Sequence, residues 1–244
     1  MLTWRRALAG CVLPSLLVCL ASAERAPKPK APPPKLPPSA QAVPLVIQPY
    51  GFDCGAAAAR AVLYYWGAYQ GSQRSLYPIL NTRSSYGTSP RDLLRGVRRL
   101  GLKAELKERM TVPALRKALK EGYSVLVELQ AWIDRSGPKI PWAERWDDGH
   151  WTAVVGVDRH YVYFMDPSSG DSTRPVGTAA YAYIPIKEFK ERWHEWDEDG
   201  KRLKHFFQPG VLIKGDRPAG LPLGTVIQGK RPVEAPLKNL VRML

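Results

Sequence analysis

The sequence predicts an α+β fold in which helices come first and an antiparallel sheet follows. Helix start and stop signals recur between residues 53 and 122. After that the apolar period becomes that of strands, and the runs 151–157 and 161–165 flank Asp158-Arg159-His160, which is typical of a hairpin. The chain has 244 residues and no internal repeat, so the part after residue 42 suits one domain with a sizeable core.

Residues 1–23 have the pattern of a cleavable export signal. Arg5 and Arg6 form a positive start, residues 7–20 are mostly apolar but short for a membrane span, and Ala21-Ser22-Ala23 is a small-residue cleavage site. The alternatives are an uncleaved signal anchor and a lipid anchor at Cys11, where Leu8-Ala9-Gly10-Cys11 resembles a lipoprotein box but does not follow the apolar run. We therefore expect an exported chain, periplasmic or secreted, without a transmembrane domain after signal cleavage.

Composition divides the remaining chain into three segments. Residues 24–42 form a linker rich in Pro, Lys and Ala that we expect to be extended and mobile, 43–213 form the domain, and 214–244 form a basic, Pro- and Gly-containing tail that we expect to be loosely attached. The formal net charge of +14 predicts a solvated basic surface, with weak attraction to anionic surfaces as the alternative. No nucleic-acid recognition motif is present, so nucleic acid is not an expected partner.

Local signals place the individual elements. We expect Asp53, Ser89 and Thr111 to cap helices that end near Gly67, Gly101 and Gly122. Further strands are expected over 102–106, 124–129, 180–184 and 210–213, and a helix over 186–196. A turn-rich loop over 133–148, with Trp132, Trp142 and Trp146, could supply aromatic walls for a peptide cleft or be plain core.

Cys54 is the first candidate functional residue. Cys11 and Cys19 fall inside the expected signal, so Cys54 would be the only thiol of the exported chain and could not form an intramolecular disulfide. It occupies the first turn of a predicted helix, where unpaired N–H groups and a partial positive charge favour a thiolate. This position is typical of a nucleophile, while a buried apolar cysteine is the structural alternative.

The predicted hairpin selects His150 from four histidines as the partner of Cys54. If Val157 pairs with Tyr161, then Thr152 lies opposite Asp166, and His150 is a diagonal neighbour of Asp166 on the same face. A carboxylate beside an imidazole fixes its tautomer and stabilises its charged form. His160, His194 and His205 lie in the turn or in the charged region after the sheet.

Gln48 completes the candidate set, because a side-chain amide near a nucleophile can donate to the oxyanion of a tetrahedral intermediate together with the backbone N–H of Cys54. Each residue also has a structural alternative, since Asp166-Pro167 is a common turn start and His150 could be a surface residue at a strand end. The sequence contains no zinc-binding pattern, no Gly-rich phosphate loop and no Gly-x-Ser-x-Gly nucleophile elbow, and we expect no cofactor.

These residues resemble the papain-like cysteine peptidases of the bacteriocin-processing, double-glycine-leader type. The run Gln48 to Gly55, with Asp53 before Cys54 and Ala57 after it, fits the first half of the family pattern. His150-Trp-Thr-Ala-Val-Val-Gly-Val-Asp158 and Asp166-Pro-Ser-Ser-Gly170 fit the second half. The resemblance covers about residues 43–213 and implies a papain-like α+β fold with the nucleophile helix packed on the sheet.

The resemblance also implies roles: Cys54 as nucleophile, His150 as general base and acid, Asp166 as orienter and Gln48 as oxyanion donor. Well-known members are fused to transporters, whereas this chain carries a signal pattern. We therefore expect a stand-alone exported hydrolase of peptide or isopeptide bonds, acting on an extracytoplasmic peptide, protein or cell-wall peptide. The alternatives are a catalytically silent peptide- or cell-wall-binding module, and an amide transferase or deamidase with the same triad.

Overall fold

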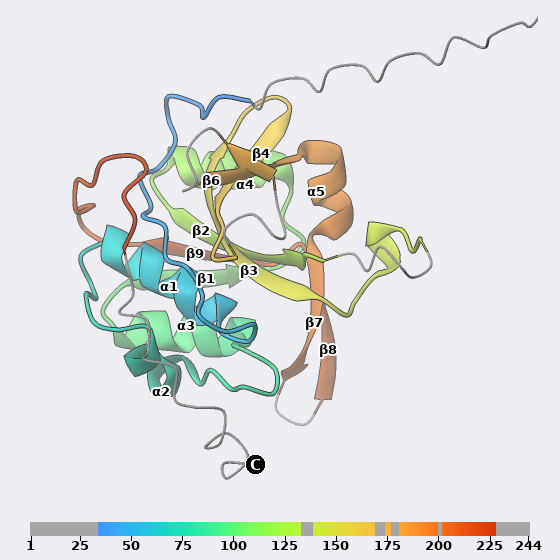
Figure 1. The fold of residues 1–244 in the computed structure, drawn as a ribbon, viewed down its shortest axis with the longest axis horizontal. Coiled ribbons are helices and arrows are strands. Elements are labelled where there is room, and N and C mark those ends of the chain that lie inside the picture. Colours follow the sequence, from blue (N-terminus) through green and yellow to red (C-terminus); the bar gives the residue numbers. More distant parts are fainter. Residues whose placement is uncertain (1–33, 133–138, 169–173, 177–180, 200–201, 228–244) are drawn as a thin grey trace, which may run out of the picture. The chain divides into compact units, whose positions relative to one another are not determined.

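The computed structural model describes residues 34–132, 139–168, 174–176, 181–199 and 202–227 (Figure 1). The predicted signal, the first part of the predicted linker and residues 228–244 lie outside these ranges. The described segments contain helices α1 to α5, two short 3-10 helices and strands β1 to β9. They confirm the predicted α+β class.

The helical elements are concentrated in the first half of the domain. The α-helices are α1 (Cys54–Tyr65), α2 (Tyr77–Leu80), α3 (Pro90–Arg99), α4 (Val112–Lys120) and α5 (Ile186–Arg192), and the 3-10 helices are η1 (Arg74–Leu76) and η2 (Trp142–Glu144). The Ser89 hydroxyl accepts a hydrogen bond from the Asp92 N–H at 3.1 Å, and that of Thr111 from the Ala114 N–H at 3.2 Å. Both predicted caps are therefore confirmed.

The strands form one antiparallel sheet and a separate pair. Among the described residues, seven strands run in the order β1-β9-β2-β3-β4-β6-β5, while β7 and β8 pair with each other as an arm at the end of the sheet (Figure 1). Their bounds are β1 (Lys103–Lys107), β2 (Ser124–Gln130), β3 (Gly149–Val157), β4 (Tyr161–Met165), β5 (Arg174–Val176), β6 (Tyr181–Pro185), β7 (His194–Asp199), β8 (Arg202–Phe207) and β9 (Gly210–Lys214).

Two apolar clusters cover the two faces of the central sheet. The first lies between the sheet and α1, where Ala56 to Ala59 and Ala61 are fully buried. The second lies on the other face, beneath α4 and α5. Because the buried side of α1 is built from alanines, this helix can approach β3 closely, which brings its amino terminus to the sheet.

Gly55 is a point of close approach between α1 and its surroundings. A Cβ at this position would lie 2.8 Å from Cβ of Thr88 and 3.0 Å from Cδ1 of Trp151. The indole of Trp151 is itself held by a 2.9 Å hydrogen bond to the backbone oxygen of Thr88, so these atoms have little room to move. The first turn of α1 is thus fixed against β3 beside the residue that carries the thiol.

A Gly55→Ala protein is therefore expected to lose about 1–3 kcal/mol of unfolding free energy through overpacking. Gly51→Ala is the matched control, because nothing lies within 4 Å of a Cβ built at Gly51. Urea unfolding followed by circular dichroism measures both proteins. Equal midpoints for the two variants would contradict this account of the packing at α1.

The predicted hairpin has the expected register at one end only. Ala153 pairs with Met165 and Val154 with Phe164, as predicted, but Val157 pairs with Val162 because the register shifts between Val154 and Gly156. An extra residue of this kind is a β-bulge. The shift lies on the turn side of the hairpin and leaves the predicted alignment of His150 with Asp166 unchanged.

The region after β6 differs from the prediction. The predicted helix over 186–196 ends at Arg192, and residues from His194 onward form β7, which pairs with β8 in a charged hairpin absent from the prediction. β5 was likewise not predicted. In β7 and β8, Asp197 lies opposite Lys204, but the ammonium of Lys204 pairs with the carboxylate of Glu108, 2.5 Å away.

The described ends of the chain pack against the domain. Gln41 donates from its backbone N–H to Val155 at 2.8 Å, and its side chain donates to the backbone oxygen of Tyr123 at the same distance. Leu45 forms a parallel bridge with Val226. The prediction of a mobile linker is thus wrong for the residues just before 43, and that of a loose tail is wrong for residues 214–227, because both segments make long-range backbone hydrogen bonds.

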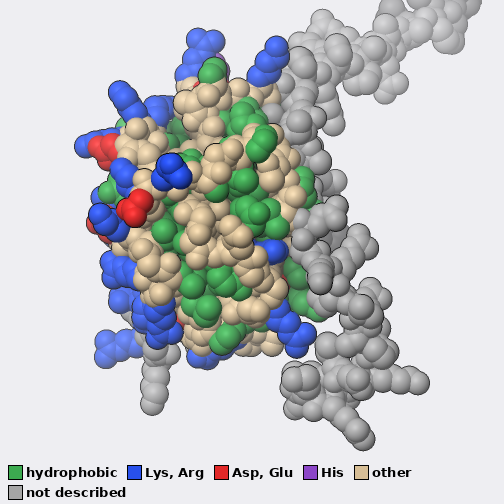
Figure 2. All heavy atoms as spheres, turned by 90° about the vertical axis from the view of Figure 1, so that its left-hand side faces the viewer, with side chains coloured by type: hydrophobic (Ala, Val, Ile, Leu, Met, Phe, Trp, Pro, Cys, Tyr) green, Lys and Arg blue, Asp and Glu red, His purple; other side chains and the backbone are tan. Residues whose placement is uncertain are grey.

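The surface agrees with the basic composition. Figure 2 shows a face on which most charged side chains are Lys or Arg and few are Asp or Glu. Within the described part of the chain, no helix is both long and apolar enough to cross a membrane.

Candidate active site

The thiol of Cys54 lies at the first residue of α1 and is 94% buried, with 6% of its surface exposed. It is the only cysteine in the described segments and is not in a disulfide. The loop before it, from Gln48 to Asp53, turns the chain sharply into the helix.

The prediction that Asp53 caps α1 is wrong, because its side chain makes no capping hydrogen bond to this helix. Its buried carboxylate instead accepts hydrogen bonds from the Tyr77 hydroxyl at 2.5 Å, Nε2 of Gln73 at 2.7 Å and the backbone N–H of Tyr50 at 3.2 Å. Burial raises the pKa of Asp53, while these hydrogen bonds oppose that shift. Asp53 therefore ties the loop before Cys54 to η1 and α2.

The structure brings His150 and Asp166 together as the hairpin register predicted. Nε2 of His150 lies 2.8 Å from Oδ1 of Asp166, and both side chains are buried, with 0% and 2% of their surfaces exposed. The same carboxylate oxygen accepts hydrogen bonds from the backbone N–H and the hydroxyl of Ser168 at 2.9 and 2.8 Å. The turn after β4 thus fixes the carboxylate, which in turn fixes the imidazole.

The thiol of Cys54 also raises the pKa of the same imidazole. Burial lowers the pKa of His150, but the charge and hydrogen bond of Asp166, together with the hydrogen-bonding and charge effects of Cys54, raise it to about 9. Nδ1 of His150 is buried and accepts or donates no regular hydrogen bond among the described residues. With Nε2 committed to Asp166, Nδ1 is the ring nitrogen left to exchange a proton with the sulfur.

Gln48 lies near this site but is engaged elsewhere. Its Nε2 donates to the backbone oxygen of Tyr50 at 2.9 Å and more weakly to that of Gly51 at 3.4 Å. Its Oε1 is buried and has no partner among the described residues. The amide thus braces its own loop, and its predicted role as oxyanion donor stays a prediction.

The other three histidines lie away from the pair of Cys54 and His150. His160 is exposed in the β3–β4 turn, and His205 is exposed on β8. His194 on β7 is bonded through Nε2 to the backbone oxygen of Arg145 at 2.6 Å, and burial lowers its pKa. Of the four histidines, His150 alone is placed with a carboxylate on one side and the thiol on the other.

The tryptophans of the predicted loop do not form one wall. Trp132 packs edge-on against the His150 ring, with ring centroids 4.9 Å apart. Trp142 lies under the guanidinium of Arg192 at 4.3 Å, and Trp146 lies between the rings of His194 and His205. Residues 133–138 of this loop lie outside the described residues. Trp132 is therefore the one tryptophan of this group that contacts the candidate site.

Sequence reasoning missed two carboxyl groups, Glu128 on β2, on which the charge of Cys54 acts, and Glu195 on β7, whose charge also acts on Glu128. Burial, then the charges of Glu195, Asp197 and Cys54, raise the pKa of Glu128 well above its usual range. Burial chiefly raises that of Glu195, to about 8. The available signal was a charged residue, Glu128, within the otherwise apolar run from Val125 to Leu129 of β2.

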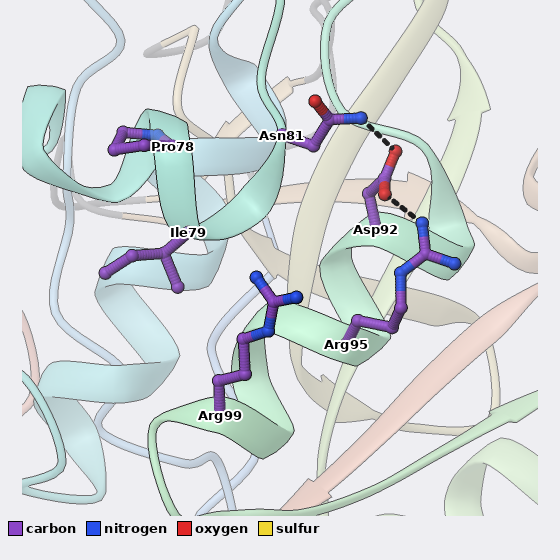
Figure 3. Close-up of a pocket in the computed structure, with 6 residues that line it drawn as sticks. All are labelled: Pro78, Ile79, Asn81, Asp92, Arg95 and Arg99. Atoms are coloured by element: carbon purple, nitrogen blue, oxygen red, sulfur yellow. Dashed lines mark hydrogen bonds and ion pairs between the residues drawn. The ribbon is translucent and has the colours of Figure 1, made fainter.

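Two other features bear on what the site can bind. Within the described residues, no group of three or more His, Cys, Asp or Glu side chains could hold a metal ion. A polar pocket between α2 and α3 is lined by Pro78, Ile79, Asn81, Asp92, Arg95 and Arg99, and includes none of the candidate residues (Figure 3). In this pocket Asp92 is bonded to Asn81 and Arg95.

Comparison with known proteins gave matches among solved structures only, because no protein-family model and no curated protein matches the chain. A double glycine motif protease from an AMS/PCAT transporter, solved in complex with the leader peptide, is 18% identical, with 77% of this chain and 100% of that chain covered and a TM-score of 0.47. The peptidase domain of Streptococcus ComA, a bifunctional ABC transporter, is 15% identical over 71% of this chain and 99% of that chain, with a TM-score of 0.49. A C39-like peptidase from Bacillus anthracis is 15% identical over 76% and 99%, with a TM-score of 0.47.

Proposed function

We propose that this protein is a cysteine peptidase of the double-glycine-leader type that hydrolyses peptide or isopeptide bonds through an acyl-enzyme. The observation that carries the proposal is the buried His150–Asp166 pair, 2.8 Å apart, whose imidazole is also acted on by the thiol at the start of α1. Nucleophile, base and orienter come from α1, β3 and the end of β4, and these three elements meet at one end of the sheet.

In this proposal His150 takes the proton of Cys54, and the sulfur attacks the carbonyl carbon of the substrate. The negative charge of the tetrahedral intermediate develops on the carbonyl oxygen, near the unpaired N–H groups at the start of α1. The imidazolium then gives its proton to the leaving amine, and water attacks the thioester to release the acid. Asp166 keeps the imidazole oriented throughout and stabilises its charged form.

Gln48 could join the backbone N–H of Cys54 as an oxyanion donor only if its amide turned from the Tyr50 carbonyl toward the substrate. The cost of that turn is partly offset, because Oε1 of Gln48 has no partner in its present position among the described residues. We propose this donor role on the strength of its position six residues before Cys54 in the motif.

We also propose that the protein is exported, periplasmic or secreted, and that its substrate is an extracytoplasmic peptide, protein or cell-wall peptide. The motif of residues 1–23 supports export. Amino-terminal sequencing of the protein recovered outside the cytoplasm should begin at Glu24, and a chain that still begins at Met1 would contradict cleavage.

Iodoacetamide labelling tests whether the thiol is activated. At about pH 6 we expect Cys54 to be alkylated faster than glutathione, because a thiolate is favoured beside an imidazolium and a helix amino terminus. The rate is measured by mass spectrometry on the full chain, with the His150→Gln protein as the control. Labelling no faster than glutathione, while the domain still binds peptides, would favour the silent binding module instead.

A further inference from the structure

Two ionisable side chains, Glu128 and Glu195, have no part in the proposed mechanism, and the charges of both Glu195 and Cys54 act on Glu128. On the sheet, Glu128 of β2 pairs directly with Trp151 of β3, and Gln130 pairs with Gly149, so these side chains share one face. Trp151 on this face also packs against the first turn of α1, at Gly55. The Glu128 side chain therefore emerges on the side of the sheet where α1 begins.

The arm formed by β7 and β8 brings a second carboxyl group to the same place. Oε2 of Glu195 accepts a 2.8 Å hydrogen bond from Nε2 of Gln130. It also lies over the bare backbone of Gly149, where a Cβ would be only 2.0 Å away. Glycine is thus needed at position 149 for this carboxyl to reach the sheet, and Glu195 and Glu128 act on each other electrostatically.

Glu128 is buried, and its Oε2 lacks a hydrogen-bond donor among the described residues. The residue is 7% exposed, and its Oε2 is fully buried. The charged groups that act on it are Glu195, Asp197 and Cys54, all of which are acidic. An orphan acceptor in this setting is unfavourable unless a donor or a cation from outside the chain meets it.

The arginines of the adjoining segments do not fill this role. Nη2 of Arg145 pairs with Asp148 at 3.2 Å. The guanidinium of Arg192 donates to the backbone oxygens of Gln130 and Ala131 and pairs with Glu188 at 3.2 Å. Asp148 also raises the pKa of Glu195, so the charges around the two glutamates remain predominantly acidic.

We propose that Glu128 and Glu195, reinforced by Asp197, form an acidic subsite that binds the ammonium or guanidinium group of a basic substrate residue next to the bond that Cys54 attacks. The inference deepens the proposed function and rests on it. A basic side chain would supply both the positive charge and the N–H donors that Glu128 lacks. The chain as a whole carries a formal net charge of +14, so an acidic site at this one place must arise from these particular residues.

The charge of the subsite can be measured at the thiol itself, without knowledge of the substrate. Three methanethiosulfonates modify thiols by the same step. The thiolate attacks the reagent sulfur that carries the alkyl group, which forms a disulfide and releases methanesulfinate. The 2-aminoethyl reagent is cationic, the 2-sulfonatoethyl reagent is anionic and the methyl reagent is neutral. With rates divided by those of a cysteine model peptide, we expect Cys54 to prefer the cationic reagent over the anionic one by at least about tenfold.

The Glu128→Gln protein keeps the shape of the side chain and replaces its ionisable carboxyl by a neutral amide, and we expect it to lower this preference by about threefold or more. Glu105→Gln is the matched control, because Glu105 is an exposed residue of β1 with a side-chain exposure of 60%. The preference should also grow between about pH 6 and about pH 9, as Glu195 loses its proton. A preference for the anionic reagent, or the same change in both variants, would overturn the acidic subsite.

A second comparison separates this inference from the proposed function. Peptides that differ only in lysine or norleucine are titrated against the Cys54→Ala protein by fluorescence anisotropy, at each position in turn. Tighter binding of a lysine peptide by about tenfold, reduced by Glu128→Gln, would support the subsite even if no peptide were hydrolysed. Equal binding of every pair, with rapid labelling by the neutral reagent, would refute the subsite and leave the thiol chemistry standing.

Discussion

A Cys54→Ala protein is expected to hydrolyse peptide substrates at least about 10³-fold more slowly than the unaltered protein, because the acyl-enzyme can no longer form. The measurement is kcat/KM on a peptide cleaved by the unaltered protein, found by profiling a peptide library. The Cys54 side chain is buried at the first residue of α1, which continues into a run of alanines, so shortening it to a methyl group should leave the fold intact.

The Cys54→Ser protein is the matched control for this result. A hydroxyl has nearly the same size and can hydrogen-bond to His150, but it is a far weaker acid, so we expect activity close to that of Cys54→Ala. Thermal unfolding of both variants checks that the fold is retained. Full activity of the alanine variant would refute Cys54 as the nucleophile. If activity were lost only because the variant unfolds, Cys54 would be a structural cysteine of the core.

The fold was predictable wherever the determining partner is close in sequence. The Ser89 and Thr111 caps bond to backbone groups three residues ahead, so the local pattern specifies them. Asp53 looked like the same kind of cap, yet its carboxylate bonds to Gln73 and Tyr77, which are 20 and 24 residues away. Such partners are set by how η1 and α2 pack on the loop, and no local signal reports that packing.

The proximity of His150 and Asp166 was predictable because a hairpin brings residues that are separated along the chain close together in space. His150 and Asp166 are 16 residues apart, and two-residue alternation brought them to one face. The bulge between Val154 and Gly156 was not predictable. Gly156 lets Pro37 pack closely on the strand, since a Cβ at position 156 would lie 2.8 Å from Cγ of Pro37. Because the bulge lies on the turn side of the pairs nearest the site, the error did not reach His150.

The sequence could not predict that Glu128 and Glu195 interact with each other. Glu195 was expected within a helix over 186–196, which would have directed it by helical spacing. The chain instead leaves α5 at Arg192 and enters β7, and the pairing of β7 with β8 then decides its direction. A strand pair that forms from charged residues shows little apolar alternation, so its period is hidden from a reading based on hydrophobicity.

The pH dependence of hydrolysis is expected to show an alkaline limb near pH 9, because His150 must keep its proton to donate it to the leaving amine and its pKa is raised to about 9. In the unfolded chain this pKa is about 6.5, so the raised value contributes stability that is complete below about pH 6.5 and is lost as pH rises through about 9. Unfolding free energy and kcat/KM should therefore decline over the same alkaline range, and a stability that rises over that range would contradict the sign of the shift.

Replacing Asp166 by Asn should move the alkaline limb to lower pH, because the charge and hydrogen bond of this carboxylate are the largest of the effects that raise the pKa of His150 against the lowering effect of burial. The same change should lower kcat/KM by about 10²–10⁴-fold, since the amide cannot stabilise the imidazolium. Asp158→Asn is the matched control: this carboxylate bonds to the N–H groups of His160 and Tyr161 at 2.7 Å at the far end of the same hairpin. It should weaken the turn without moving the limb. If the alkaline limb moved equally in both variants, its position would depend on the hairpin as a whole and not on Asp166. If the limb stayed near pH 9 in both variants, Asp166 would not control the pKa of His150.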